Sequence, residues 1–233
     1  MTDRAAFIRA NTAWSRMPLV PEIGLFLATE ITPIWQATEA WLTAHDTAPP
    51  FWAFAWPGSQ ALARLVLDDP SLVRGRRVLD FASGCGLAAI ACAQAGAAQV
   101  EAADIDPLAL DAIRLNAAAN GVGVTALQGD VVGSACRWDL VVCGDVCYEA
   151  PMARQILPWL RAMAASAEVW IADPGRAYVP HEGLRVLRTT TVATTLELEG
   201  QTERRVTIFQ LKGEVPVLRP SSGLPSTPIS GKS

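Results

Sequence analysis

Short apolar runs alternate with longer amphipathic stretches through the middle of the chain. The apolar runs predict strands at residues 78–81, 99–103, 122–128, 139–144 and 168–172. The stretches between them carry apolar residues at helical spacing and predict helices at residues 86–95, 107–119 and 152–164, the last kinked at Pro158. Short strands that alternate with helices are joined by right-handed crossovers, so this pattern predicts an α/β fold with a mostly parallel sheet.

The pattern changes after the last of these strands. Residues 184–199 and 204–211 are rich in β-branched side chains and flank Gly200, which predicts an antiparallel hairpin. Before the alternating region, residues 1–16 have loose helical spacing, and residues 21–28 predict a short strand or an edge segment. We therefore expect the sheet to end in antiparallel strands and to carry an N-terminal helical extension.

Two further helices are predicted before the first parallel strand. Thr32 and Pro33 are typical of an N-cap and a first helical residue, for a helix that continues to residue 42, and residues 62–67 lie on a second helical run. From residue 213 onward, proline, serine and glycine dominate, which predicts a disordered tail. The expected boundaries are an N-terminal extension and lid over residues 1–57, a main domain over 58–212 and a tail over 213–233.

Composition narrows the class of protein. The chain has 233 residues, 51% of them hydrophobic, and a net charge of −4, which argues against a nucleic-acid-binding surface. No apolar run approaches the length of a membrane span, and the N-terminus has neither a signal-peptide core nor a transit-peptide character. The five cysteines lack paired spacing and there are only two histidines, so we expect no metal site. A cytoplasmic monomer is the resulting expectation.

A glycine-rich turn follows the first parallel strand, in the segment VLDFASGCG over residues 78–86. Glycines let a backbone approach a ligand closely, although any βα unit can need them for packing alone. Gly84, Gly86 and Ala89 also satisfy the spacing of a dinucleotide-binding loop. Asp80 decides between ligands, because a carboxylate there would repel a pyrophosphate but suits the sulfonium and ammonium groups of S-adenosylmethionine.

Two more acids follow the next two strands. Asp104 can accept hydrogen bonds from both hydroxyls of a ribose, as it would in a nucleotide site of either kind, whereas Asp106 fits better as the cap of the next helix. Asp130 can accept from an adenine amino group. Each acid alone is compatible with a solvated strand end. Together with Asp80 they lie at the carboxyl ends of successive strands, where open α/β sheets bind ligands.

These segments resemble the motifs of the class I, or seven-stranded, S-adenosylmethionine-dependent methyltransferases. Residues 78–86 are similar to the first motif, residues 103–107 to the second and residues 129–131 to the third. The resemblance implies a Rossmann-like seven-stranded sheet. It also implies that the cofactor is bound by Trp56, Asp80, Ser83, Gly84, Gly86, Asp104, Ile105, Asp130, Val131 and Cys143.

A narrower resemblance covers nearly the whole ordered chain. PFWAFAWPG at residues 50–58, GDVCYE at residues 144–149 and DPGR at residues 173–176 are similar to the electron-transfer-flavoprotein β-subunit lysine methyltransferases. This resemblance implies a protein substrate, the flavoprotein β subunit, with lysines near its recognition loop trimethylated. Family members labelled as nicotinamide or ribosomal-protein methyltransferases leave the substrate open.

The Asp-x-x-Tyr element after the fourth parallel strand carries the expected chemistry. Methyl transfer needs a neutral amine, but a free lysine with a pKa near 10.4 is mostly protonated. Asp145 is expected to hold the incoming ammonium and orient its lone pair, and Tyr148 to offer its ring face to the cation. The alternative is that Asp145 caps the following helix and Tyr148 packs against it. Arg176 is expected to contact a protein substrate or to pair with a surface acid.

Three other functions compete with protein-lysine methylation. A small-molecule N-methyltransferase would use the same cofactor site but would be expected to carry a larger lid. A binding module that kept only the fold would have little reason to keep Asp80, Asp104 and Asp130 together with Asp145. A nicotinamide-dependent oxidoreductase is disfavoured by Asp80.

Overall fold

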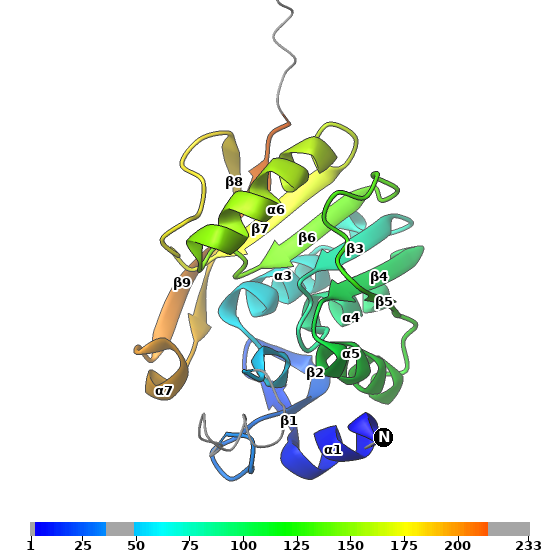
Figure 1. Ribbon diagram of the computed structural model, residues 1–233, viewed down its shortest axis with the longest axis vertical. Helices are drawn as coiled ribbons and strands as arrows, with labels where there is room; N and C mark the ends of the chain where they lie inside the picture. Colours follow the sequence, from blue (N-terminus) through cyan, green and yellow to red (C-terminus); the bar gives the residue numbers. More distant parts are fainter. Residues whose placement is uncertain (1–2, 36–48, 214–233) are drawn as a thin grey trace, which may run out of the picture.

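The computed structural model describes residues 3–35 and 49–213 and is built around a seven-stranded sheet (Figure 1). The strand order is β5-β4-β3-β6-β7-β9-β8, and the five strands from β5 to β7 are parallel. They are β3 (Arg77–Phe81), β4 (Gln99–Asp104), β5 (Thr125–Gln128), β6 (Leu140–Gly144) and β7 (Glu168–Asp173). The structure therefore confirms the mostly parallel sheet and the place of each predicted strand, with ends that differ by up to three residues.

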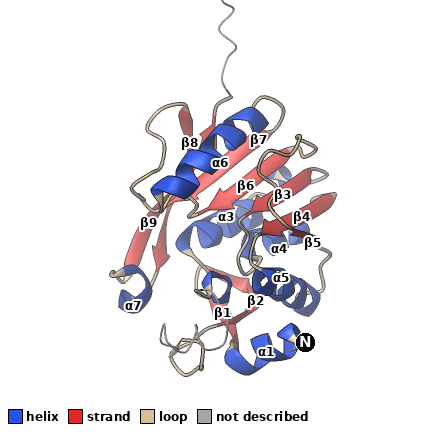
Figure 2. Ribbon diagram, in the orientation of Figure 1, coloured by secondary structure: helices blue, strands red, loops and turns tan. Residues whose placement is uncertain are grey.

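Helices cover both faces of this sheet (Figure 2). They are α3 (Pro57–Asp68), α4 (Leu87–Gln94), α5 (Pro107–Ala119) and α6 (Ala150–Met163), which contains Pro158. Strand residues alternate between the two faces: Val78 packs in a core cluster with α3 and α4, whereas Leu79 packs in a second cluster with α6. This period of two, with both faces buried, explains why the strands are continuous apolar runs in the sequence.

The N-terminal extension differs from the expected helical one. Helix α1 (Arg4–Asn11) is followed by an antiparallel pair, β1 (Ala13–Met17) and β2 (Val20–Leu27). Strand β2 is held on α5, because the Asn116 side chain accepts a hydrogen bond from the Phe26 N–H at 2.8 Å. These strands were only partly predicted, since β1 has no apolar run and its residues are half-buried or exposed.

The helix predicted from Thr32 to residue 42 falls largely outside the described residues. Its described part forms turns, with the Thr32 hydroxyl bonded to the Thr29 carbonyl at 2.8 Å. A short 3₁₀ turn, η1 (Phe51–Ala53), leads into α3, and a second one, η2 (Pro70–Leu72), leads out of it. The predicted tail also lies outside the described residues, except for residue 213.

The predicted hairpin is present but shorter in its first strand. Strand β8 (Leu184–Ala193) ends before a one-turn helix, α7 (Leu196–Glu199), and β9 (Glu203–Leu211) returns between β8 and β7. Thr195 caps α7 through its hydroxyl, and this local capping outcompetes continuation of the strand. Because β8 and β7 both pair antiparallel with β9, they run in the same direction. Helix α7 therefore lies on the side of the sheet to which the parallel strands point (Figure 1).

Candidate active site

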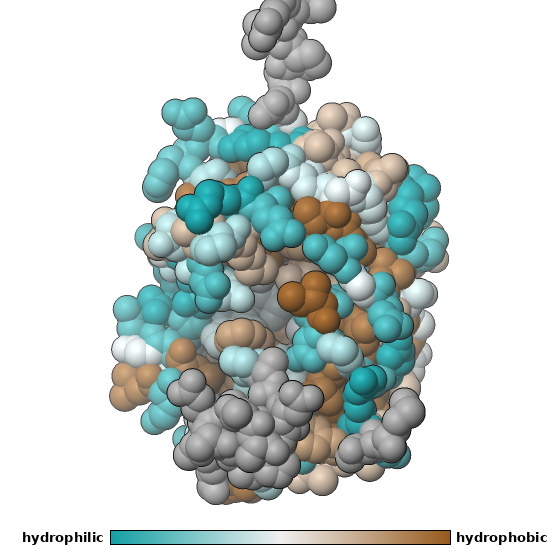
Figure 3. Space-filling model, in the orientation of Figure 1, coloured by the Kyte–Doolittle hydropathy of each residue, from teal (hydrophilic) through white to brown (hydrophobic). Residues whose placement is uncertain are grey.

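The carboxyl ends of β3, β4, β6 and β7 meet near the centre of one face of the molecule. That face is hollowed where these strands end (Figure 3). Among the residues that the structure describes, two other than glycine adopt positive φ, namely Ala82 at 54° after β3 and Asp145 at 57° after β6. Such conformations are uncommon outside glycine and tend to occur at functional sites. Both lie at this edge of the sheet, which marks it as the candidate site.

The loop between β3 and α4 has the shape that its glycines permit. Gly84 and Gly86 have φ of 55° and 85°, and Gly86 is the N-cap of α4. A Cβ on Gly86 would lie 3.3 Å from the Ile113 side chain, so this glycine is needed for both its φ and the packing of α5. A Cβ on Gly84 would meet only ordinary contacts, so its conformation is what favours glycine there.

Asp80 braces this loop from below. It is 3% exposed, and its Oδ2 accepts hydrogen bonds from the Ser83 hydroxyl at 2.5 Å and from the Ala89 N–H at 3.0 Å. Burial raises the pKa of Asp80 to about 7, against the lowering effect of these two bonds. Contact between the Asp80 charge and the ligand stays a prediction, and the hydrogen bonds seen in the structure give this carboxylate a role in shaping the loop.

Asp104 ties the loop to the end of β4. Its Oδ2 accepts a hydrogen bond from the Gly84 N–H at 2.9 Å, and its Oδ1 accepts from the Asp106 N–H at 3.0 Å. Burial raises the pKa of Asp104. Asp106 caps α5 by accepting from the Leu108 N–H, as predicted. The apolar side chain of Ile105 lies beside this carboxylate in the chain and is 79% exposed.

The remaining predicted cofactor residues divide between the surface and the core. Asp130 is exposed after β5 and accepts a hydrogen bond from the Val132 N–H at 2.9 Å, and Val131 packs against the cluster below α6. Cys143 is fully buried within β6, and its thiol donates to the Trp170 carbonyl at 3.6 Å. The strand turns the Cys143 side chain into the α6-side core, and a cofactor contact by this residue stays a prediction.

The residues around this loop fit S-adenosylmethionine. A carboxylate has about four acceptor sites, and two backbone bonds leave Asp104 with capacity for the two hydroxyls of a ribose. The exposed Ile105 offers an apolar surface for the neighbouring base. Among the described residues, no group of three His, Cys, Asp or Glu side chains is arranged to hold a metal ion. The free acceptor sites of Asp104 and the apolar surface of Ile105 form a donor set that suits a nucleoside.

We expect Asp104→Asn to weaken cofactor binding. The asparagine keeps one acceptor oxygen for the loop but loses the second acceptor and the charge, so the dissociation constant of S-adenosylhomocysteine should rise about tenfold to a hundredfold. Isothermal titration calorimetry measures it directly. Asp111→Asn is the matched control, since Asp111 lies on α5 and pairs with Arg114 at the surface. Equal affinities for the two variants would contradict the assignment.

Asp145 follows β6 and is engaged on both oxygens. Its Oδ2 accepts a hydrogen bond from the Gly58 N–H at 2.6 Å, and its Oδ1 accepts from Arg176 Nη2 at 2.9 Å. Trp56, the N-cap of α3, makes no side-chain capping bond, so Asp145 caps this helix from across the site. The sequence left open that Asp145 caps the following helix. The structure shows that the helix it caps is the preceding α3.

Helix α3 approaches β6 at backbone distance. A Cβ on Gly144 would lie 2.7 Å from the Ser59 nitrogen, and one on Gly58 would lie 2.7 Å from the Ala172 carbonyl oxygen. Only two residues without side chains permit this contact. It brings the Gly58 N–H within reach of Asp145, and it was not found from the sequence because the two glycines belong to different elements.

Aromatic side chains border the site on the side of α3. The Phe51 ring lies 6.0 Å from both the Trp56 and the Tyr148 rings, and Trp56 Nε1 donates to the Phe51 carbonyl at 2.9 Å. Tyr148 is 41% exposed, and burial raises its pKa. Phe51 is half exposed and lies between the predicted residues Trp56 and Tyr148, but it was not itself predicted from the sequence.

Arg176 comes from the loop after β7. It donates to Asp145 and also to Glu199 on α7, at 2.6 Å from Nη2 and 3.1 Å from Nη1. Glu199 is in turn bound by Arg204 Nε at 3.0 Å. Arg176 was expected to pair with a surface acid, and it pairs instead with the buried Glu199 and Asp145. Neither Glu199 nor Arg204 was predicted, because α7 was taken as strand.

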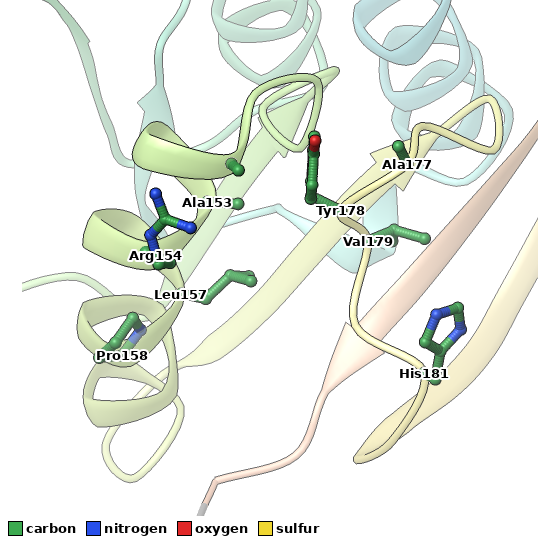
Figure 4. Close-up of a pocket in the computed structure, with 9 residues that line it drawn as sticks. Ala153, Arg154, Leu157, Pro158, Ala177, Tyr178, Val179 and His181 are labelled. Carbon is green, nitrogen blue, oxygen red and sulfur yellow. The ribbon is translucent and has the colours of Figure 1, made fainter.

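A groove of about 520 Å³ runs beside the site between α6 and residues 177–181 (Figure 4). Its lining includes Arg154 and Leu157 of α6, together with Tyr178 and His181. The Tyr178 N–H donates to the Cys147 carbonyl at 3.2 Å, so the groove begins next to the Asp145–Tyr148 segment.

Comparison with known proteins shows the family to which this chain belongs. The family model of ribosomal protein L11 methyltransferase matches residues 61–146. The electron transfer flavoprotein β-subunit lysine methyltransferase of Xenopus laevis is 40% identical over 189 residues, which cover 78% of this chain and 75% of the relative. The chain belongs to this family of lysine methyltransferases. The human relative is 40% identical over 177 residues, covering 73% of this chain and 66% of that protein.

Solved structures agree on the fold. A putative RNA methyltransferase from Pyrococcus horikoshii has a TM-score of 0.54 and 18% identity, covering 77% of this chain and 100% of that one. Magnesium protoporphyrin IX methyltransferase from Synechocystis, solved with bound S-adenosylmethionine, has a TM-score of 0.50 and 21% identity, covering 66% of this chain and 79% of that one. The family and the donor set together make S-adenosylmethionine the cofactor of this chain, as its sequence predicts.

Proposed function

We propose that this protein transfers methyl groups from S-adenosylmethionine to lysine side chains of the β subunit of the electron transfer flavoprotein. The similarity to the Xenopus laevis enzyme carries the proposal, because it extends over 189 residues and therefore well beyond the cofactor loop. The geometry supports it, since Asp145 and Tyr148 lie at the end of β6, which pairs with β3, the strand that leads into that loop.

The cofactor residues have the task of fixing the donor. When bound, S-adenosylmethionine supplies a methyl group on a positively charged sulfur. Asp104 would accept hydrogen bonds from the ribose hydroxyls, and Asp130 would accept one from the adenine amino group. The loop at Gly84 and Gly86, braced by Asp80, lets the backbone approach closely. Trp56 and its neighbour Phe51 exclude water from the reacting end.

Asp145 and Tyr148 have the task of presenting the amine. The carboxylate of Asp145 receives the lysine ammonium, and the exposed ring of Tyr148 faces the cation and the methyl groups it gains. Burial raises the pKa of Asp145 to about 6, so the difference between this pKa and that of lysine becomes smaller. Transfer of the ammonium proton from lysine to the Asp145 carboxylate is therefore easier. The neutral amine is then held in line for attack.

A protein substrate fits the surroundings of this site better than a small amine. Tyr148 is 41% exposed, and the groove between α6 and residues 177–181 is lined by Tyr178, whose N–H donates to the carbonyl of the neighbouring Cys147. A polypeptide can therefore lie across this surface while one side chain enters the site. The negative charge of the chain, −4, gives no support to a nucleic-acid substrate. Within the described residues, no helix has the length and apolar character needed to span a bilayer.

The proposal is tested by labelling. The purified enzyme and tritiated S-adenosylmethionine are incubated with recombinant flavoprotein, with ribosomal protein L11 and with a set of small primary amines. We expect label in the flavoprotein β subunit, at lysine by mass spectrometry of its peptides. Label only in L11 would replace the substrate by a ribosomal protein, and label only in the amines would exclude a protein substrate.

A further inference from the structure

A buried chain of charges connects the reacting end of the site to the tip of the hairpin. Asp145, Arg176, Glu199 and Arg204 follow one another through hydrogen bonds of 2.6 to 3.0 Å. The side chains of Asp145 and Glu199 are almost fully buried, and those of the two arginines are largely so. Buried ion pairs are rarely the most stabilising solution for a fold, so this chain calls for a functional explanation.

Arg176 is held at both its backbone and its side chain. Asp173 Oδ1 accepts from the Arg176 N–H at 2.6 Å and from the Gly175 N–H at 2.7 Å, which fixes the turn. Glu199 accepts from both terminal nitrogens of the guanidinium, a geometry that orients its plane. The remaining hydrogen bond of Nη2 is thereby aimed at Asp145.

The charges of this cluster do not balance. Asp145, Asp173 and Glu199 supply three carboxylates, whereas Arg176 and Arg204 supply two guanidinium groups. Within the described part of the chain, Asp173 Oδ2 is buried and makes no hydrogen bond. The cluster therefore carries one more negative than positive charge, and the ammonium group of an incoming lysine would balance it.

We infer that Arg176 is a positioning residue for methyl transfer, because its hydrogen bond keeps the Asp145 carboxylate charged and fixes its orientation. Glu199 keeps the guanidinium in place when the substrate ammonium also binds to Asp145. This inference rests on the proposed function, because the ammonium is that of the lysine. It makes α7, at the tip of the hairpin, a structural support of the reacting end.

The charged groups around Asp145 predict the direction in which its pKa changes when Arg176 is removed. Burial raises the pKa of Asp145, Arg176 lowers it through its charge and its hydrogen bond, and Asp173 at the end of β7 raises it. Cys147 lies on the following segment, Glu199 acts through Arg176, and α3 contributes only the Gly58 N–H. Loss of Arg176 therefore moves the pKa of Asp145 upward, above about 6.

The test compares Arg176→Gln with the wild type across pH 6.5 to 9 on the flavoprotein substrate. The ratio of their kcat/KM values cancels the titration of the substrate lysine, which both enzymes share. We expect a ratio below about one tenth at pH 6.5 that rises about tenfold by pH 9, since Asp145 is then ionised in both. Arg176→Lys keeps the charge and should restore part of the rate at low pH.

Arg188→Gln is the matched control, because Arg188 lies on β8 of the same hairpin and pairs with Asp68 away from the site. Its ratio should stay near one at every pH. A ratio for Arg176→Gln that does not change with pH would overturn the inference. No labelling by the wild type would instead be a failure of the proposed function.

A second variant decides the matter if Arg176→Gln no longer binds S-adenosylhomocysteine. Glu199→Gln leaves Arg176 charged but unanchored, so we expect kcat to fall about fivefold or more with unchanged pH dependence and unchanged affinity for S-adenosylhomocysteine. A kcat equal to that of Arg188→Gln would overturn the inference.

Discussion

Asp145→Asn is expected to slow methyl transfer by about a hundredfold or more, because the site loses the charge that receives the ammonium and the group that takes its proton. Asparagine has nearly the same shape and tolerates the positive φ of 57° found at this position. Its amide can accept from either the Gly58 N–H or Arg176, but its NH₂ group then opposes the other donor. The rate is measured by transfer of tritium from S-adenosylmethionine.

Two measurements isolate the chemical effect of this substitution. The affinity for S-adenosylhomocysteine should stay close to that of the wild type, because Asp104 and the loop at Gly84 are unchanged. Asp139→Asn is the matched control, since Asp139 pairs with Arg77 at the surface, at the opposite end of β6. Loss of cofactor affinity together with activity would instead make Asp145 part of the cofactor site.

Gly144→Ala is expected to reduce the free energy of unfolding by about 2–3 kcal/mol, because the added methyl group overpacks a backbone contact. Its Cβ would lie 2.7 Å from the Ser59 nitrogen and 2.9 Å from the Gly58 carbonyl carbon. These are backbone atoms of α3, so the strain is relieved only by moving the whole helix away from β6. Urea denaturation monitored by circular dichroism measures the change.

Gly123→Ala serves as the control for this substitution. Gly123 precedes β5 at the surface, and a Cβ there would meet no atom within 4 Å. Its free energy of unfolding should lie within about 0.5 kcal/mol of the wild type. Since α3 also carries the Gly58 N–H, Gly144→Ala should lose activity along with stability. Equal stabilities of the two variants would show that α3 shifts at no cost.

The sheet was predictable because its signal is local. Each parallel strand is a short run buried on both faces, as Val78 and Leu79 illustrate by packing in separate clusters. The acids at the strand ends followed from this, since the residue after an apolar run must lie at the ligand-binding edge. The N-terminal pair of strands was harder to predict, because the half-buried residues of β1 have no periodic apolar signal.

The hydrogen-bond partners of those acids could not be predicted from the sequence. Asp80 and Asp104 were read as ligand-facing charges, whereas much of their bonding is to backbone N–H groups of the loop between them. Whether a carboxylate turns toward the ligand or toward the backbone depends on rotamers and on packing. Glu199 was hidden for a different reason: β-branched residues before it favoured strand, and the Thr195 cap that begins α7 is a weak signal.

Asp145 both receives the substrate ammonium and caps α3, which has a practical consequence for experiments that capture substrates. An inactive enzyme used as bait must keep the shape of its recognition surface, and alteration of Asp145 also removes the capping group of α3. Tyr148 is 41% exposed and contacts Phe51 only through its ring, so Tyr148→Phe preserves that contact. Tyr148→Phe therefore keeps both the α3 cap and the aromatic border of the site, and it is the bait with which capture by an Asp145 variant should be compared.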